Sequence, residues 1–291
     1  MVEAMRIAFS FQETMAALLL PILLLFSGTS HADQSILLHS LPPILAASSP
    51  HLSSPSWWRP KPGTSWQWQL SGTIDTSIDV RMYDIDLFDT PQTVIDQLHH
   101  DGRKVICYFS AGSYENWRPD KNSYPPEILG NDLDGWPGEK WVDIRQLDTL
   151  GPILSARFDL AVTKQCDGIE PDNIDGYTNT TGFPLTANDQ LVFNRWLADQ
   201  AHSRGLSIGL KNDLDQVPEL INDFDWALNE ECFQYDECDA LLPFIQAGKA
   251  VFGVEYKGDT GDFCPKANAK NFDWLKKKID LDSWRIPCRN Q

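Results

Sequence analysis

The sequence predicts an α/β protein, a single (β/α)8 barrel of the TIM type that follows an N-terminal signal peptide and a linker. Short apolar runs alternate with helical patterns eight times over about 225 residues, which is typical of a parallel sheet. The competing arrangement is an open doubly wound sheet, but no G-x-G-x-x-G pattern follows the first apolar run to support it. The reactive residues of a closed barrel are expected at the C-terminal ends of its strands.

The first 62 residues show the pattern of a leader and a spacer. Arg6 precedes the apolar run "MAALLLPILLLF", and the small residues of "SHA" predict a signal peptide over residues 1–32, cleaved after Ala32. Twelve apolar residues, with Pro21 among them, are too few to span a bilayer comfortably, so we expect no stable membrane span. An uncleaved signal anchor at the membrane or cell wall is the alternative. Residues 33–62 are rich in Ser, Pro, Leu and His and are interpreted as a linker, which leaves 63–291 as one folded domain.

Eight strands and several helices are expected in that domain. The strands lie near residues 66–70, 80–84, 104–109, 168–171, 207–210, 226–229, 250–254 and 285–288. In "TPQTVIDQLHHDG", Thr90 is the expected N-cap and Gly102 follows the helix end. In "TANDQLVFNRWLADQAHSRG", Thr186 and Asp189 match a capping box. The segment "KNFDWLKKKI" is predicted as a helix before the last strand.

The charge of the chain limits its partners. With 24 basic against 41 acidic residues, the net charge is −17. Nucleic acid and anionic membrane surfaces are therefore disfavoured, because both need a basic surface. A cationic partner is compatible with the charge, although acidity can also serve solubility alone.

Six cysteines form an even set in the mature part of the chain, and secretion favours disulfides over thiols. "CFQYDEC" closes a short loop, so Cys232 should pair with Cys238. For the remaining four we expect Cys107–Cys166 and Cys264–Cys288. No C-x-x-C occurs, which weakens zinc and thioredoxin-like interpretations.

Acidic residues follow five of the predicted strands. Residues 168–171 lead into Asp172, and alternation places Glu170 and Asp172 on one face, toward the barrel mouth. The strand over 226–229 leads into Glu230 and Glu231. The others end in "MYDID", "GLKND" and "GVEY". Strands commonly leave the core into polar loops, but five converging ends predict an acidic cleft that contains one lysine.

The remaining composition favours carboxylate chemistry. None of the six histidines lies at a predicted strand end, and no G-x-S-x-G occurs, so a histidine-rich metal site and a serine triad are both disfavoured. We expect no metal and no cofactor. Two carboxyl groups can act on a glycosidic bond as acid and nucleophile. The long segment after the third strand carries Trp117, Trp136 and Trp141, which could wall a sugar cleft or could serve packing alone.

Four segments, "ICYFSAGSYENWRPD", "GIEPDNIDGYTNTTGF", "GLSIGLKND" and "LNEECFQYDEC", together resemble the endo-α-1,4-polygalactosaminidases, glycoside hydrolase family 114. The resemblance runs from about residue 57 to the C-terminus. It implies a (β/α)8 barrel that hydrolyses α-1,4-linked galactosamine polymers without a metal. The two catalytic carboxylates would be Asp172 as the nucleophile and Glu230 as the acid/base, which implies a retaining reaction.

The resemblance and the charge agree on the substrate. Galactosamine units without acetyl groups are cationic, so an acidic cleft would attract them; removing the leader changes the net charge only to −16, because it holds Glu3, Glu13 and Arg6. Glu230 must hold a proton while Asp172 stays ionised. Further residues expected to bind substrate are Asp84, Tyr108, Trp117, Glu170, Asp175, Tyr177, Lys211, Asn212 and Glu255. We expect a secreted monomer. A barrel hydrolase for another polysaccharide and a catalytically silent carbohydrate-binding wall protein are the alternatives.

Overall fold

The computed structural model describes residues 57–289, so the predicted signal peptide and residues 33–56 of the predicted linker lie outside the described residues. Residues 57–62 contact the folded domain. The ring of Trp57 stacks on that of His202 with 4.2 Å between centroids, and Arg59 Nε lies 2.8 Å from Asp225 Oδ1. The N-terminal end of the described chain is thereby held against α3 and the start of β9.

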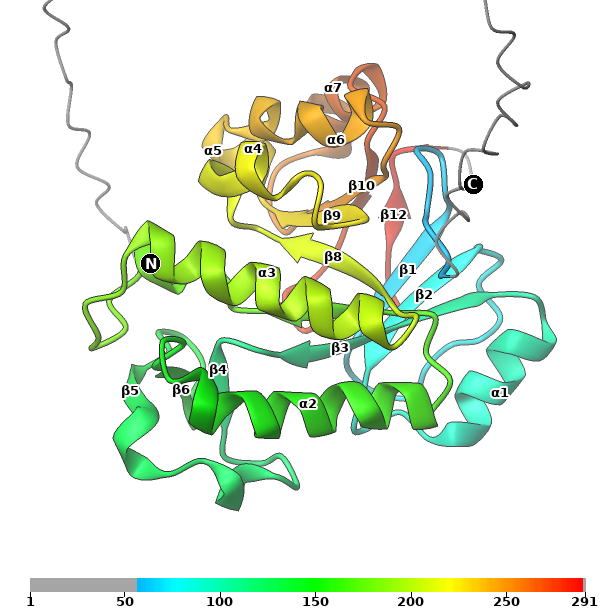
Figure 1. Cartoon of the computed structure of the whole chain (residues 1–291). Helices are drawn as coiled ribbons and strands as arrows, with labels where there is room; N and C mark the ends of the chain where they lie inside the picture. The colour runs from blue at the N-terminus through cyan, green and yellow to red at the C-terminus, as the bar shows by residue number, and fades with distance from the viewer. Residues whose placement is uncertain (1–56, 290–291) are drawn as a thin grey trace, which may run out of the picture. The chain divides into compact units, whose positions relative to one another are not determined.

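One sheet organises the domain (Figure 1). Its eight parallel strands follow one another in chain order, and a short antiparallel strand completes it. They are β1 (Trp66–Gln69), β2 (Met82–Asp86), β3 (Lys104–Ser110), β7 (Gly168–Asp172), β8 (Ser207–Lys211), β9 (Trp226–Glu230), β10 (Val251–Glu255), β11 (Asp273–Lys276) and the antiparallel β12 (Ile286–Pro287).

The sheet curls into a TIM-like barrel, as predicted. Within the described residues, β1 and β11 form no strand ladder, and single hydrogen bonds connect these strands and the segments that follow them. Trp66 Nε1 donates to the carbonyl of Asp273 at 2.9 Å, and the amide of Leu70 donates to the carbonyl of Leu281 at 3.0 Å. The first bond links β1 to β11 and the second links the segments that follow them, and the C-terminal ends of the parallel strands lie along one edge of the curled sheet.

Seven helices lie between the strands of the described chain. They are α1 (Gln92–His100), α2 (Leu147–Thr163), α3 (Ala187–Ser203), α4 (Val217–Leu220), α5 (Cys232–Tyr235), α6 (Leu242–Gln246) and α7 (Thr260–Ala269). Single 3₁₀ turns are η1 (Lys121–Ser123), η2 (Pro126–Ile128), η3 (Gly176–Thr178), η4 (Leu214–Gln216) and η5 (Cys238–Leu241). None of the helices in residues 57–289 is long and apolar enough to cross a membrane.

Two helix starts test the sequence predictions. The capping box of Thr186 and Asp189 is confirmed, since both reciprocal bonds to the backbone are present. The N-cap prediction for Thr90 is wrong: α1 begins one residue later, after Pro91, with no side-chain cap. Thr90 is buried instead, and its carbonyl accepts a bond from Lys164 Nζ.

The predicted helix over residues 270–279 is also wrong, and with it the placement of the eighth barrel strand at 285–288. Residues 273–276 form β11, paired in parallel with β10, while β12 adds an antiparallel pair beyond it. Phe272, Trp274 and Leu275 are fully buried, so packing decides the conformation of a segment whose lysines favour a helix. The other seven predicted strands correspond to β1, β2, β3, β7, β8, β9 and β10.

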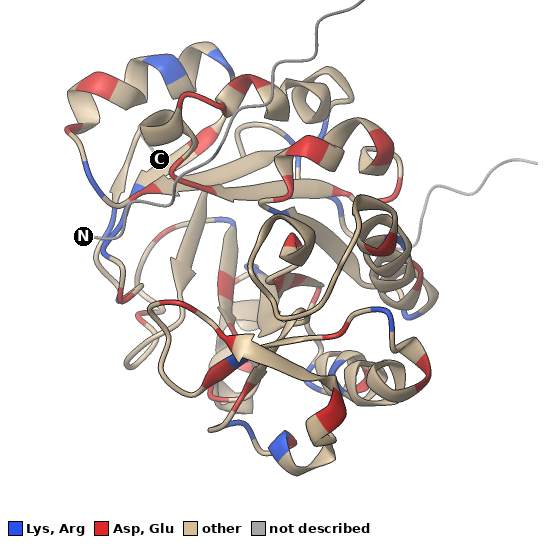
Figure 2. Ribbon diagram, turned by 90° about the vertical axis from the view of Figure 1, so that its left-hand side faces the viewer, with Lys and Arg blue, Asp and Glu red and all other residues tan. Residues whose placement is uncertain are grey.

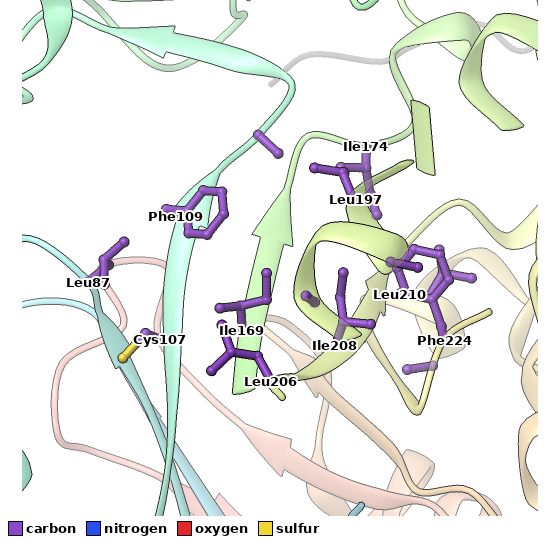
Figure 3. Close-up of a cluster of buried hydrophobic side chains, with 14 of the residues drawn as sticks. Leu87, Cys107, Phe109, Ile169, Ile174, Leu197, Leu206, Ile208, Leu210 and Phe224 are labelled. Carbon is purple, nitrogen blue, oxygen red and sulfur yellow. The ribbon is translucent and has the colours of Figure 1, made fainter. Parts of the chain in front are cut away.

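The sheet separates two apolar layers. Inside the barrel, Trp66, Trp68, Trp226 and Phe252 pack together below the mouth. Gly209 makes room for one of these rings, since a Cβ there would lie 2.4 Å from the indole of Trp226. Outside, a larger cluster fills the space between strands and helices; Figure 3 shows part of it, including Phe109, Ile169, Ile208 and Leu197. With both faces of the sheet covered, polar chemistry is confined to the strand ends.

A three-stranded antiparallel sheet interrupts the connection between β3 and α2. Its strands are β4 (Ser113–Glu115), β5 (Leu129–Asp132) and β6 (Glu139–Val142), in the order β4-β6-β5. Buried ion pairs tie this insertion to the barrel: Arg118 Nη2 lies 2.7 Å from Asp86 Oδ2 and 2.8 Å from Glu115 Oε1. Trp117 and Trp136 are about half exposed, whereas Trp141 is buried.

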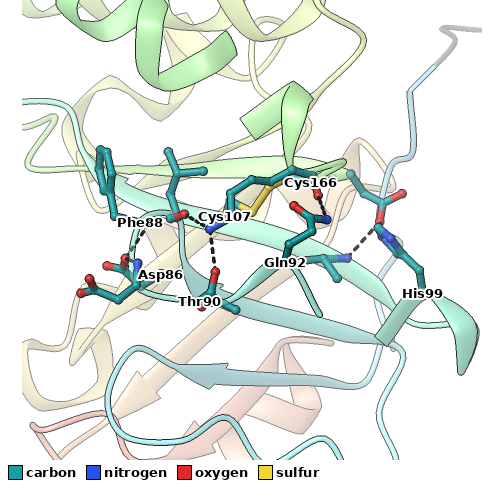
Figure 4. The surroundings of a disulfide bond; sticks show 12 residues. Asp86, Phe88, Thr90, Gln92, His99, Cys107 and Cys166 are labelled. Carbon is teal, nitrogen blue, oxygen red and sulfur yellow. Dashed lines mark hydrogen bonds and ion pairs between the residues drawn. A yellow bond between two sulfur atoms is a disulfide. The ribbon is translucent and has the colours of Figure 1, made fainter. Parts of the chain in front are cut away.

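The three expected disulfides are all confirmed, as Cys107–Cys166, Cys232–Cys238 and Cys264–Cys288. Figure 4 shows the first, which joins β3 to the segment between α2 and β7 next to Thr90 and Gln92. The second follows β9 directly and closes the loop that begins with Glu231. No free cysteine occurs in the described part of the chain.

Candidate active site

Asp172 and Glu230, the two predicted catalytic carboxylates, lie at the last positions of β7 and β9. The ammonium of Lys211, at the end of the intervening strand β8, lies between them. Its Nζ is 3.1 Å from Asp172 Oδ1 and 3.3 Å from Glu230 Oε2. The structure therefore brings the two carboxylates to one site, about a shared cation. Both are partly accessible, with 20% and 27% of their side chains exposed.

Asp172 receives donors on both carboxylate oxygens. Tyr108, from β3, donates its hydroxyl to Oδ2 at 3.0 Å. The backbone amide of Asn173 donates to Oδ1 at 2.8 Å, beside the ammonium of Lys211. Together these three donors fix the direction of the carboxylate.

Glu230 is held from the other side. The hydroxyl of Tyr256, just beyond β10, donates to its Oε1, and Lys211 lies by its Oε2. Its backbone amide donates to the side-chain oxygen of Asn212 at 3.0 Å, and the same oxygen accepts from Asn229 Nδ2 at 3.2 Å. Burial, followed by the charge of Glu230, holds the pKa of Tyr256 far above its usual range, so this phenol stays a donor.

A second carboxylate layer lies below the first. Glu170 and Asp84 are fully buried, and Lys211 Nζ is 2.7 Å from Glu170 Oε1. Burial alone would lower the pKa of Lys211, but Asp172, Glu170 and Glu230 outweigh it and hold the pKa well above the ordinary value. Burial, reinforced by the neighbouring Glu170, raises the pKa of Asp84 well above its usual range.

This layer combines one cation with two acids. The protonated form of Asp84 suits its contact with Glu170, since two carboxylates that share a buried site cannot both ionise easily. The ring of Trp68 supports the ammonium of Lys211, with 4.7 Å between Nζ and the ring centroid. Lys211 thus provides the positive charge that the surrounding carboxylates share.

Left-handed backbone conformations gather at these strand ends. Asn173 follows β7 with φ of 59°, Asn212 and Asp213 follow β8 with φ of 51° and 41°, and Glu231 follows β9 with φ of 63°. Non-glycine residues adopt this region at a cost, and such positions cluster at functional sites. Each of the three adjacent strands therefore turns sharply directly after its last residue, at Asp172, Lys211 and Glu230.

The other predicted site residues are distributed around the mouth. Asp175 and Tyr177 lie in the segment around η3, and the side chain of Tyr177 bonds Asp213. Burial and the charge of Asp172 raise the pKa of Asp175 to about 6, and burial with Asp175 raises that of Asp213 to about 8. Trp117 lies in the insertion with 47% of its surface exposed.

The structure does not bring Glu255 to the pair. The neighbouring Val254 packs inside the barrel, so Glu255 points to the opposite side of β10. Its Oε1 accepts the amide of Phe233 at 3.0 Å, and it lines a separate hollow of about 270 Å³ formed with residues of α5 and α7.

Sequence reasoning missed Tyr256 and Asn173, the two residues that hold Glu230 and Asp172 directly. Strict alternation along β10 was the available signal for Tyr256, because residues 252, 254 and 256 share the inner face. For Asn173 the signal was weaker: asparagine tolerates the left-handed conformation that a sharp strand exit requires.

The arrangement consists of two carboxyl groups at the ends of β7 and β9 of a TIM-like barrel, each with its own tyrosine donor and both beside one ammonium. In residues 57–289 no group of His, Cys, Asp and Glu side chains has the arrangement of a metal site. Acid and nucleophile chemistry on a glycosidic bond fits such a pair, so the fold and site define the class of glycoside hydrolases.

Comparison with known proteins gives the family. The chain matches the glycoside-hydrolase family GH114 over residues 47–291. It is similar to Aspergillus fumigatus Ega3, solved in complex with galactosamine, with 46% identity and a TM-score of 0.77, over 79% of this chain and 97% of that one. This chain therefore belongs to family GH114, the endo-α-1,4-polygalactosaminidase glycoside hydrolases.

More distant structures share the fold. The glycoside hydrolase domain of PelA from Pseudomonas aeruginosa matches with a TM-score of 0.59 at 12% identity, over 76% of this chain and 96% of that one. Eubacterium rectale Amy13B matches with a TM-score of 0.51 at 9% identity, over 76% of this chain and 66% of that one. The comparison with curated proteins found no match.

Proposed function

We propose that this protein is a secreted, endo-acting, retaining hydrolase of α-1,4-linked galactosamine polymers. The observation that carries the proposal is the pair Asp172 and Glu230 about Lys211. Membership of GH114 and the likeness to Ega3, which was solved with galactosamine, support the substrate class. Three disulfides support an oxidising destination outside the cell.

Asp172 is the nucleophile in this proposal. Its ionised oxygen attacks the anomeric carbon as the bond to the leaving oxygen breaks, and Glu230 gives its proton to that oxygen. In the second step Glu230 takes a proton from water, whose oxygen attacks the anomeric carbon and releases Asp172. Lys211 and Tyr108 stabilise the carboxylate that attacks, and Tyr256 orients Glu230.

The spacing about the shared ammonium is compatible with retention. Two oxygens at 3.1 and 3.3 Å from one nitrogen can be separated by no more than the sum of those distances. That limit concerns these two oxygen atoms alone and is compatible with the separation of about 5–5.5 Å between the carboxyl groups of retaining enzymes.

Seven of the nine predicted substrate-binding residues divide into two groups by burial, apart from Tyr108, which bonds Asp172, and Glu255, which lies away from the pair. Asp84, Glu170 and Lys211 are at most 1% exposed and would act on the sugar through Asp172 and Glu230. Asp175, Tyr177, Asn212 and Trp117 remain candidates for direct contact. Acids at the mouth suit a polymer that carries amines, since opposite charge raises its local concentration.

The test is hydrolysis of purified α-1,4-galactosamine polymer by the mature chain, with Asp172→Asn and Glu230→Gln as the variants. Each substitution keeps the side-chain shape and removes a charge or a proton, so we expect losses on the order of 10²- to 10⁴-fold for the acid/base and at least as much for the nucleophile. Glu231→Gln is the matched control, as it changes the adjacent acid of the same loop. NMR of the first-formed product should show the α-anomer.

Full activity of Asp172→Asn or Glu230→Gln would show that the substituted residue is not catalytic. A β-anomer as the first product would overturn the retaining mechanism. Activity on another polysaccharide with none on galactosamine polymers would replace the substrate class. A wild-type chain that binds the polymer without cleaving it would be a carbohydrate-binding protein.

A further inference from the structure

Glu139 is a buried acid that the proposed chemistry does not use. It begins β6 in the insertion between β3 and α2, opposite Glu115 of β4, and is 5% exposed. Its Oε1 accepts the hydroxyl of Ser113 and lies 3.3 Å from Asn173 Nδ2. An acid carried by the insertion thus contacts the residue that follows Asp172.

Two serines connect Glu139 to Asn173 by a second route. The hydroxyl oxygens of Ser110 and Ser113 are 2.5 Å apart, and Asn173 Nδ2 donates to Ser110 Oγ at 2.9 Å. Each hydroxyl has one proton. Because Ser113 donates to Glu139, Ser110 must donate to Ser113, which leaves Ser110 Oγ free to accept from Asn173. All donors in this chain therefore point toward Glu139.

Asn173 joins that chain to Asp172. Its backbone amide donates to Asp172 Oδ1 at 2.8 Å. The φ of Asn173 is 59°, a left-handed conformation that a non-glycine residue keeps only when surrounding contacts, here those of its side chain, stabilise it. The amides of Ala111 and Gly112 donate to the carbonyl of Asp172 at 2.9 and 3.1 Å. Residues 110–113 therefore form hydrogen bonds with both the backbone of Asp172 and the side chain of Asn173.

We propose that Glu139 is a positioning residue for the nucleophile: through Ser113, Ser110 and the side chain of Asn173 it fixes the amide that orients the carboxylate of Asp172. The inference rests on the proposed function, in which Asp172 attacks the sugar. It also gives the insertion a role in the chemistry, since β6 supplies the terminal acceptor of the chain.

The experiment is a double-mutant cycle on the mature chain, with kcat and KM measured on α-1,4-galactosamine polymer. Glu139→Ala should lower kcat about 10-fold, which is the scale of one orienting hydrogen bond, and change KM less than twofold. Asn173→Gly permits the left-handed backbone and removes the side chain. In that background Glu139→Ala should cost no more than twofold, because the link is already broken.

Two further variants separate orientation from stability. Glu139→Gln keeps an acceptor oxygen and should restore kcat to within threefold of wild type, while Ser113→Ala should reproduce Glu139→Ala. Glu127→Ala, an exposed acid of the same insertion, is the control and should leave kcat unchanged. If Glu139→Ala fails to fold, Glu139→Gln and Ser113→Ala still test the chain.

Equal losses from Glu139→Ala in the wild-type and Asn173→Gly backgrounds would overturn the proposal, as would a loss confined to KM. Failure of the proposed function is a different result, because it would appear as a wild-type chain with no hydrolysis of this polymer.

Discussion

Replacing Lys211 with methionine removes the charge on which the carboxylate cluster depends. Methionine keeps an unbranched apolar stem of similar length while it removes the ammonium and the contact of Nζ with the ring of Trp68. The cluster loses ion pairs of 2.7 Å to Glu170, 3.1 Å to Asp172 and 3.3 Å to Glu230. Removing one partner of a buried pair costs about 3–5 kcal/mol, so we expect the free energy of unfolding to fall by that order near neutral pH.

The loss should depend on pH in a defined direction. Burial raises the folded-state pKa of Glu170 from 4.5 to about 7, against the attraction of Lys211. The stability that a raised pKa contributes is present below the unfolded-state value and is lost as pH rises through the folded-state value. Without the ammonium that folded-state pKa rises further, so the deficit of the variant should widen above about pH 7.

The widening is about 1.4 kcal/mol per pH unit for one proton, or about 2 kcal/mol between pH 7 and 8.5. Lys211 itself adds no slope in this range, because its folded-state pKa lies well above 10.5 and the residue is charged in both states. The measurement is urea unfolding at pH 5, 7 and 8.5, with hydrolysis assayed at each pH.

Lys164→Met is the matched control for that measurement. Lys164 Nζ donates to the carbonyls of Leu87 and Thr90, both at 2.6 Å, so its loss removes hydrogen bonds without releasing a carboxylate. Its deficit should be nearly flat from pH 5 to 8.5. Parallel pH profiles for the two variants would refute the reasoning, because Lys211 would then act through packing alone.

Three further predictions concern the cleft, the loop at Gly112 and the disulfides. KM for fully deacetylated polymer should rise with ionic strength while KM for acetylated polymer stays flat; equal, flat responses would contradict electrostatic attraction. Gly112→Ala should lower kcat on the order of 10²-fold, because a Cβ there would lie 1.7 Å from the carbonyl oxygen of Asn173. Gly151→Ala is the control and should have little effect, because the atom nearest to its added Cβ would be 3.4 Å away. Serine replacement of Cys107 and Cys166, which are 59 residues apart, should lower the free energy of unfolding by about 4 kcal/mol. The same replacement of Cys232 and Cys238, which are six residues apart, should lower it by about 2 kcal/mol. Equal losses in urea unfolding would count against loop entropy as the cause.

The elements that the sequence predicted correctly are those with local signals. Seven strands were recognisable as short apolar runs, and the start of α3 was marked by Thr186 and Asp189, three positions apart. The failures have a common cause in tertiary packing. Residues 270–279 contain good helix formers, yet burial of Trp274 against its neighbours makes them a strand, and no local pattern shows that burial.

The candidate site shows the same division. Asp172, Glu230 and Lys211 end three neighbouring strands, so their convergence follows from a parallel barrel. Their partners come from distant parts of the chain: Tyr256 follows a strand beyond Glu230, and Glu139 belongs to a small sheet outside the barrel. Sequence alone locates the carboxylates, whereas the hydrogen bonds that orient them depend on the assembled loops.

The acidic residues of this protein form two sets with different effects, those of the catalytic pair and those spread over the rest of the surface. Around Asp172 and Glu230 the charges are balanced internally by Lys211, at distances of 3.1 and 3.3 Å that salt screens little. Acidic positions elsewhere are spread over helices and loops and give the chain its net charge (Figure 2). Salt should therefore weaken binding of a cationic polymer without disturbing the catalytic pair. Lys211→Met should disturb the catalytic pair without weakening the binding of the polymer. A rise in KM with salt at constant kcat, together with a loss of kcat in Lys211→Met, would establish that attraction and catalysis use different charges.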